Sequence, residues 1–112
     1  MTSGLSDLRR LQVLSDLIRD SRLEAVKQAA QAEVQTCRRL EALSQNGAAL
    51  DLHPAAAHAA SLAYESWAEL RRRELLVTLA RQRAELAEAE AAARDAFGRA
   101  EAIKSILGRL GD

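Results

Sequence analysis

The sequence is poor in the residues that end helices, cross-link small folds or fill compact cores. Its 112 residues include one proline, one cysteine and three aromatic residues: Tyr64, Trp67 and Phe97. A single cysteine excludes an internal disulfide and is typical of a reducing compartment. No run of β-branched residues alternates with polar ones, so strands are not expected. Alanine and leucine supply most of the apolar residues, which favours helices packed side by side.

Neither charge nor hydropathy points to nucleic acid or to a bilayer. The chain has 16 basic and 16 acidic residues, and the balance is local: seven against six in residues 1–46, and nine against nine in residues 54–112. This balance excludes whole-chain electrostatic attraction to nucleic acid or anionic lipid. There is no apolar run of about 18 residues and no signal-peptide pattern. We therefore expect a cytoplasmic protein that does not insert into the membrane.

One break divides the chain, at "SQNGAALDLHPAAAHAA", residues 44–60. Asn46-Gly47 predicts a helix stop with Gly47 at positive φ, and His53-Pro54 predicts a helix start. We predict a single domain over residues 1–112, with one helix over about 6–45, a turn over 46–53 and a second helix over about 54–107. The fold class is all-α, a two-helix antiparallel coiled-coil hairpin forming an elongated rod.

Heptad spacing predicts which residues meet between the helices. In the second helix the predicted seam residues are Leu79, Leu86, Ala93, Ala100 and Leu107, with Leu76 and Phe97 three residues before two of them. The first helix shows two phases separated by a shift near residue 22. Their residues are Leu8, Leu11, Ser15 and Ile18, then Leu23, Val26, Ala30, Cys37 and Leu40. On this pattern Cys37 is a small buried hydrophobe.

A turn centred near residue 50 predicts that facing residue numbers sum to about 101. Pairing would then end near residues 95–97, and roughly the last dozen residues would have no partner within the chain. We predict a protein-binding surface on this overhang. Its residues are Phe97, Ile103, Ile106, Leu107 and Leu110. The alternative is a frayed end, because Gly108 and Gly111 weaken the last turn.

The sequence offers no catalytic or metal-binding constellation. His53 and His58 are five residues apart, so on a helix they point to different faces, and no base lies within reach of Cys37 by spacing. We predict no enzymatic activity, no metal and no cofactor. Arg71, Arg72 and Arg73 alternate with Glu69 and Glu74, which predicts solvated pairs such as Glu69 with Arg73.

Trp67 has two interpretations, core packing near Val34 and Cys37 or an exposed anchor for a partner, and the first is favoured. If the second holds, Trp67, Arg71 and Arg72 form a second contact with a partner.

The chain resembles the FliJ/YscO type of stalk protein from bacterial flagellar and type III secretion export systems. The residues that carry the resemblance are Trp67, the segment "RRRELLVTLARQRAEL" after it, and the final "AARDAFGRAEAIKSIL". The resemblance implies an antiparallel coiled coil whose chain ends enter the channel of a hexameric export ATPase. It also implies contact with the membrane export gate, peripheral to the inner membrane, and in some members with export chaperones.

Two classes of function remain at this point. The first is a non-catalytic stalk or adaptor that couples the export ATPase to the export gate. The second is a generic self-associating coiled-coil scaffold, in which two hairpins form a weak homodimer by covering each other's overhangs.

Overall fold

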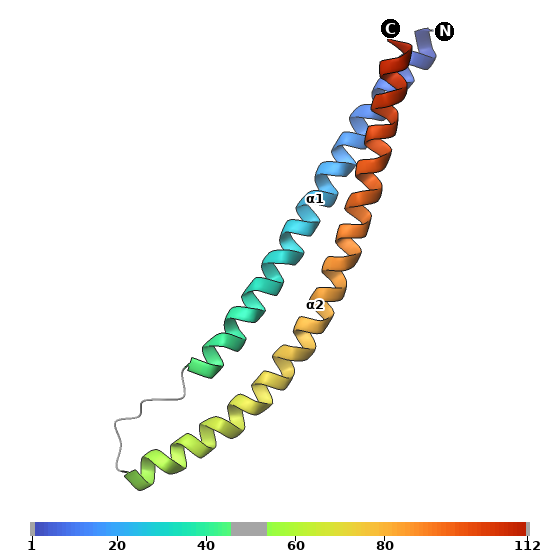
Figure 1. The fold of residues 1–112 in the computed structure, drawn as a ribbon. Helices are drawn as coiled ribbons and strands as arrows, with labels where there is room; N and C mark the ends of the chain where they lie inside the picture. The colour runs from blue at the N-terminus through green and yellow to red at the C-terminus, as the bar shows by residue number, and fades with distance from the viewer. Residues whose placement is uncertain (1, 46–53, 112) are drawn as a thin grey trace. The chain divides into compact units, whose positions relative to one another are not determined.

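The computed structural model describes residues 2–111 except 46–53. It contains two helices, α1 (Thr2–Gln45) and α2 (Pro54–Leu110), and no strand within the described ranges. The predicted all-α class and the two-helix antiparallel hairpin are confirmed (Figure 1).

The inner ends of the helices lie where the sequence predicts them, at Gln45 and Pro54. The outer ends extend further than predicted. The first helix begins at Thr2 instead of near residue 6, and the second continues through Gly108 to Leu110 instead of ending near residue 107. Gly108 lies inside α2 and has no positive φ, so it does not end the helix. The turn over 46–53, and with it the predicted positive φ of Gly47, lies outside the described residues.

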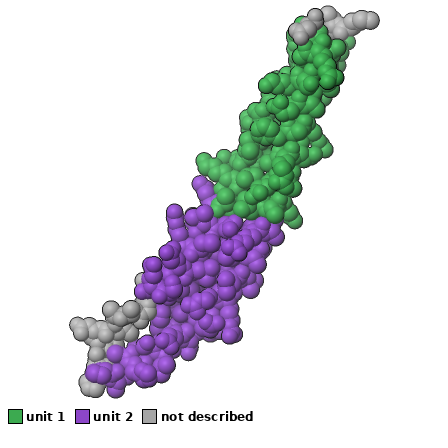
Figure 2. All heavy atoms as spheres, in the orientation of Figure 1, with its two compact units in different colours: residues 1–30, 85–112 green, residues 31–84 purple. Residues whose placement is uncertain are grey.

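The chain divides into two compact units, each of which pairs a segment of α1 with a segment of α2 (Figure 2). Unit 1 consists of residues 1–30 and 85–112, and unit 2 of residues 31–84. Unit 1 contains both chain ends, and the first turns of α1 lie beside the last turns of α2 there (Figure 1).

Unit 2 has an apolar core between its helices. Leu43 of α1 packs with Ala68 and Leu75 of α2, and Leu40 and Tyr64 lie against this cluster. Leu79 is buried one turn further along α2. The Tyr64 hydroxyl donates a hydrogen bond to the carbonyl oxygen of Leu43 at 3.3 Å. This bond crosses between the helices and reaches one of the last carbonyls of α1, which have no partner inside their own helix.

A polar layer follows this core along unit 2. Thr36 is 2% exposed, and its hydroxyl donates to the carbonyl oxygen of Ala32, four residues earlier, at 3.2 Å. The Arg83 guanidinium of α2 pairs with the half-buried carboxylate of Glu33 on α1, with Nε and Oε1 3.3 Å apart. Threonine tolerates burial here because its hydroxyl is satisfied within its own helix.

Unit 1 has no buried leucine among its described residues. Its buried residues are Ala93, Ala96 and Ala100 on α2 and Ser15 on α1. The Ser15 hydroxyl donates to the carbonyl oxygen of Leu11 at 2.8 Å. Small side chains at these positions allow close approach of the two backbones, but each buries little apolar surface.

The predicted register is wrong. In unit 2 Glu33 pairs with Arg83, and in unit 1 the Arg19 guanidinium lies over the Phe97 ring, 5.5 Å from its centroid. The two residue numbers sum to 116 in each case, instead of about 101. At that sum the end of α2 is level with the start of α1. The last dozen residues therefore have a partner within the chain, and the overhang does not exist.

The predicted seam is right for α2 at its heptad positions and wrong for much of α1. Leu79, Ala93 and Ala100 are buried, and Leu86 and Leu107 are half-buried, as expected. Several residues predicted for the seam lie exposed instead: Leu11, Ile18, Leu23, Cys37, Leu76 and Phe97. On α1 the inward positions keep one phase, at steps of three and four apart from one step of seven between Arg19 and Val26, where Arg22 and Leu23 are exposed. They are Leu5, Leu8, Gln12, Ser15, Arg19, Val26, Ala29, Glu33, Thr36, Leu40 and Leu43. The phase shift predicted near residue 22 is therefore wrong. It was inferred from the spacing of hydrophobic residues, and several seam positions of α1 are polar.

Candidate protein-interaction surfaces

More large hydrophobic side chains are exposed in the described structure than are buried or half-buried between its helices. Among the described residues, only three leucines are buried between the helices: Leu43, Leu75 and Leu79. The exposed large hydrophobics number fifteen: Leu11, Val13, Leu14, Leu17, Ile18, Leu23, Val34, Leu62, Trp67, Leu70, Leu76, Val77, Phe97, Ile106 and Leu110. Where such side chains lie together on one face, they are typical of a surface that another protein covers.

The five residues of the predicted C-terminal surface do not share one side of α2. Ile103 and Leu107 are half-buried and continue the seam that runs through Ala96 and Ala100. Phe97, Ile106 and Leu110 are exposed. Phe97 and Ile106 are nine residues apart, which is half a turn out of phase, so they face opposite sides of α2. Contact with a partner at these five residues stays a prediction, now without the overhang that motivated it.

The side of unit 1 that carries Phe97 is charged. Arg19 lies over the Phe97 ring and also pairs with Asp16 at 3.4 Å and with Asp20 at 3.3 Å. A guanidinium that bridges a ring and two carboxylates holds α1 against α2 on this side. Arg94 and Glu101 are exposed on the same helix as Phe97, three residues before it and four after it.

The other side of unit 1 is marked by Ile18, the residue next to Arg19. A hollow of about 120 Å³ lies between the helices there and is lined by Ile18, Arg22, Ala92, Asp95, Ala96 and Arg99. We call it the unit-1 hollow. Alanine at residues 92 and 96 leaves it open, and its rim carries one ion pair, Asp95 with Arg99 at 3.3 Å. Arg22 forms no ion pair with any residue that the structure describes.

Exposed leucines lead from this hollow toward the start of α1. Leu11, Leu14 and Ile18 are exposed and are spaced three and four residues apart, which places them on one face of the helix. Asp7 lies four residues before this run and Arg22 four after it. We call the five residues the outer stripe. Sequence reasoning assigned Leu11 and Ile18 to the seam and missed Leu14, although the spacing of the three was the signal for one shared face.

In unit 2, Trp67 is 54% exposed, so the favoured prediction that it packs in the core is wrong. Its ring leans on Tyr64, with centroids 5.7 Å apart and planes at 48°. Tyr64 in turn reaches Leu43, so the tyrosine fills the place that the prediction gave to the tryptophan. Trp67 therefore faces solvent, with one side of its ring in contact with Tyr64.

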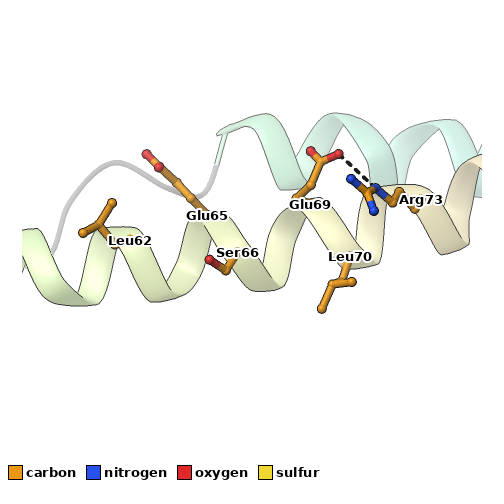
Figure 3. A pocket seen from close by; sticks show the side chains of 6 residues that line it. All are labelled: Leu62, Glu65, Ser66, Glu69, Leu70 and Arg73. Atoms are coloured by element: carbon orange, nitrogen blue, oxygen red, sulfur yellow. Dashed lines mark hydrogen bonds and ion pairs between the residues drawn. The ribbon is translucent and has the colours of Figure 1, made fainter.

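A second hollow, of about 490 Å³, lies on α2 alone and opens to solvent (Figure 3). Its lining consists of Leu62, Glu65, Ser66, Glu69, Leu70 and Arg73. Figure 3 shows Ser66 and Leu70 pointing away from α1, while the Glu65 and Glu69 carboxylates point to the other side of the helix. A helix surface this open, with leucines and charged side chains on adjoining faces, suits an amphipathic partner helix better than a small molecule.

All three arginines of the cluster pair with carboxylates of α2 itself. Arg73 pairs with Glu69 at 3.4 Å, as the sequence predicts, and Arg72 pairs with the same carboxylate at 2.8 Å. Arg71 pairs with Glu74 at 3.1 Å. All of these pairs are solvent-exposed, so each contributes a few tenths of a kcal/mol, on the order of 0.3. Recognition of a partner by Arg71 and Arg72 stays a prediction.

The helices of the described chain contain no window of 18 residues apolar enough to span a membrane. Within the same residues, no three His, Cys, Asp or Glu side chains come close enough together to hold a metal ion. No protein family, curated protein or solved structure matches this chain.

Proposed function

We propose that the chain is a non-catalytic coiled-coil adaptor: a cytoplasmic stalk, peripheral to the inner membrane, that couples a hexameric secretion ATPase to an export gate. The proposal rests on the resemblance of its sequence to the FliJ/YscO stalk proteins and on one structural observation. That observation is that fifteen large hydrophobic side chains are exposed in the described residues, against three buried leucines and eight half-buried large hydrophobics. Each of the exposed side chains would gain apolar burial in contact with a partner.

The distribution of these side chains in unit 1 supports insertion into a ring. Ile18 and Leu11 lie on the side of the unit-1 hollow, whereas Phe97 lies on the charged side. A flat partner would cover one side only. The channel of a hexamer presents repeated surfaces all round, so it can contact apolar residues on both sides at once.

In this proposal unit 2 carries the second contact, with the gate or a chaperone. Trp67, Leu62 and Leu70 are exposed on α2, and the last two line the hollow of Figure 3. Tryptophan is among the residues that most often anchor an interface. Arg71 and Arg72 lie beside it and would set orientation rather than affinity.

The test measures ATP hydrolysis by the purified export ATPase of the same organism, with and without this chain. We expect stimulation by the wild type. A Phe97→Ser, Ile106→Ser variant should weaken apparent affinity by at least tenfold, because both side chains are exposed and available to a partner. The control is Val77→Ser, which removes a still more exposed aliphatic residue from unit 2.

Absence of both binding and stimulation would exclude the coupling role and leave the scaffold alternative. Loss of helical circular dichroism in the Phe97→Ser, Ile106→Ser variant would instead indicate that the Arg19–Phe97 contact is structural. Leu110→Ser, at an exposed residue with no such contact, then replaces it in the assay.

A further inference from the structure

The outer stripe of unit 1 has an approximately symmetric pattern, with an acidic residue at one end, a basic residue at the other and aliphatic residues between them. Asp7 begins it, Leu11, Leu14 and Ile18 follow, and Arg22 ends it. The acid and the base lie at equal distances from a centre between residues 14 and 15, and so do Leu11 and Ile18. A helix with this pattern is complementary to an antiparallel copy of itself, because Asp7 then faces Arg22 and Leu11 faces Ile18, while Leu14 lies next to the centre and approaches Leu14 of the other copy.

We propose that the outer stripe docks a second copy of this chain, with α1 packed antiparallel on α1 across a two-fold axis near Leu14. Asp7 of each copy then lies opposite Arg22 of the other, and Leu11 opposite Ile18. The inference does not rest on the proposed export role, but both use Leu11 and Ile18, so a ring and a second copy would compete for this side of unit 1.

The unit-1 hollow supplies the receiving site for this packing. Its volume of about 120 Å³ is close to that of cavities known to accept one small apolar group, about 150 Å³. Ile18, Ala92 and Ala96 form its apolar part. Since Leu11 of the second copy faces Ile18, its side chain enters the hollow, and the two-fold axis repeats the contact at the other end. Each copy offers both the protruding leucine and the hollow that accepts it.

The charges at the ends of the stripe are available for this contact. Arg22 has no ion-pair partner among the described residues, although it lies on the rim of the hollow. The carboxylate of Asp7 meets only Arg10, at 3.9 Å with both side chains more than 70% exposed, a pair that contributes little. Two Asp7–Arg22 pairs would form per dimer, and their sign is what fixes the antiparallel direction.

A second copy fits this face better than a highly charged partner. Residues 1–30 carry five basic and four acidic side chains, and residues 85–112 carry four and six, so unit 1 has a net charge of −1. A near-neutral surface neither repels its own copy nor attracts a strongly basic or acidic protein. The stripe covers only about four helical turns, so the dimer should be weak, with a dissociation constant in the micromolar to millimolar range.

The experiment is sedimentation equilibrium of the full chain with charge-reversal variants. Wild type should show dimer at about 1 mM protein. Asp7→Arg places two arginines opposite each other at both ends, and Arg22→Asp places two aspartates there, so each variant should dimerise at least tenfold more weakly. The chain with both substitutions should recover dimerisation. An equimolar mixture of the two single variants should form a heterodimer, because every pair in it is again opposite in sign.

Matched controls lie on the charged side of unit 1. Glu101→Arg makes the same change of charge as Asp7→Arg, and Val13→Ser removes an exposed aliphatic residue as Leu11→Ser does. Leu11→Ser should weaken the dimer at least tenfold, and both controls by less than twofold. The proposal is overturned if wild type is monomeric at that concentration, if the mixture fails to pair, or if the controls weaken dimerisation as much. Helical circular dichroism of every variant separates loss of dimer from loss of fold.

Discussion

Unit 2 buries leucine between its helices, whereas unit 1 buries alanine and serine. The three buried leucines of the described chain, Leu43, Leu75 and Leu79, all lie in unit 2, and the buried residues of unit 1 are Ala93, Ala96, Ala100 and Ser15. Unit 1 contains large aliphatic side chains as well. It holds most of them on its surface, among them Leu11, Leu14 and Ile18.

This difference indicates a division of roles along one hairpin. Apolar area removed from water is the main stabilising contribution to folding, so the leucine core of unit 2 should carry most of the stability of the free chain. Unit 1 buries little between its own helices and offers much to a partner. We expect its backbone amides to exchange with solvent faster than those of unit 2, and binding to slow that exchange.

The largest expected effect is on the core of unit 2. Leu75 is 3% exposed and contacts Leu43 and Ala68, so Leu75→Ala should lower the free energy of unfolding by about 3 kcal/mol. The matched variant in unit 1 is Leu14→Ala, at a residue 55% exposed, and it should change stability by less than about 0.5 kcal/mol. Urea denaturation followed by circular dichroism measures both.

Equal losses of stability in the two variants would contradict the division of roles, because they would mean that Leu14 is buried in a contact, within the chain or with a second copy, that stabilises the folded state. Repeating the measurement at low and high protein concentration identifies that case, since a dimer contact contributes only when the dimer is populated.

The parts of this fold that the sequence predicts are those where alanine and leucine occupy the inward positions. Leu79, Ala93 and Ala100 follow a seven-residue spacing along α2, and all three are buried. The inner helix ends were predictable for a local reason, since Asn46-Gly47 favours a stop and Pro54 favours a start.

The seam of α1 could not be predicted from hydrophobic spacing because half of it is polar. Gln12, Ser15, Arg19, Glu33 and Thr36 stand at inward positions. Ser15 and Thr36 bond to their own helix, Glu33 pairs across to Arg83, and Arg19 reaches Phe97. The contacts of Glu33 and Arg19, and the burial of Ser15 and Thr36, depend on where α2 lies, which a pattern within α1 does not contain. The register failed for the same reason, because it was derived from the centre of the turn and not from contacts between helices.

The corrected register makes a prediction at the end of α2. Ile103 and Leu107 are half-buried in the seam, so replacing both with serine should lower the free energy of unfolding by about 2 kcal/mol. Ile106→Ser with Leu110→Ser removes two aliphatic side chains of the same segment that are exposed, and should cost less than about 0.5 kcal/mol. Thermal and urea unfolding measure the two pairs. If the two double variants were equally stable, Ile103 and Leu107 would not be covered by α1, and the register given by Arg19 and Phe97 would be wrong.

The smallest expected effect is a gain, at a polar position inside unit 2. Gln82 is half-buried on α2, and its side-chain oxygen is buried without a hydrogen-bond partner in the described structure. An unsatisfied buried acceptor destabilises the folded state, and leucine at this position would also extend the apolar core beyond Leu79. Gln82→Leu should therefore raise the free energy of unfolding by about 1 kcal/mol, measured by urea denaturation.

Gln35→Leu is the control for this gain, because Gln35 is exposed in the same unit and the substitution changes helix propensity in the same way. A gain at Gln82 alone shows that unit 2 forgoes stability at its polar layer, next to the Glu33–Arg83 pair. A loss at Gln82 would show that its amide group holds that layer together. The polar layer would then fix the register of the two helices, as a buried polar residue does in other coiled coils. In unit 2, polar contacts would set the alignment of the helices, and the buried leucines would provide most of the stability.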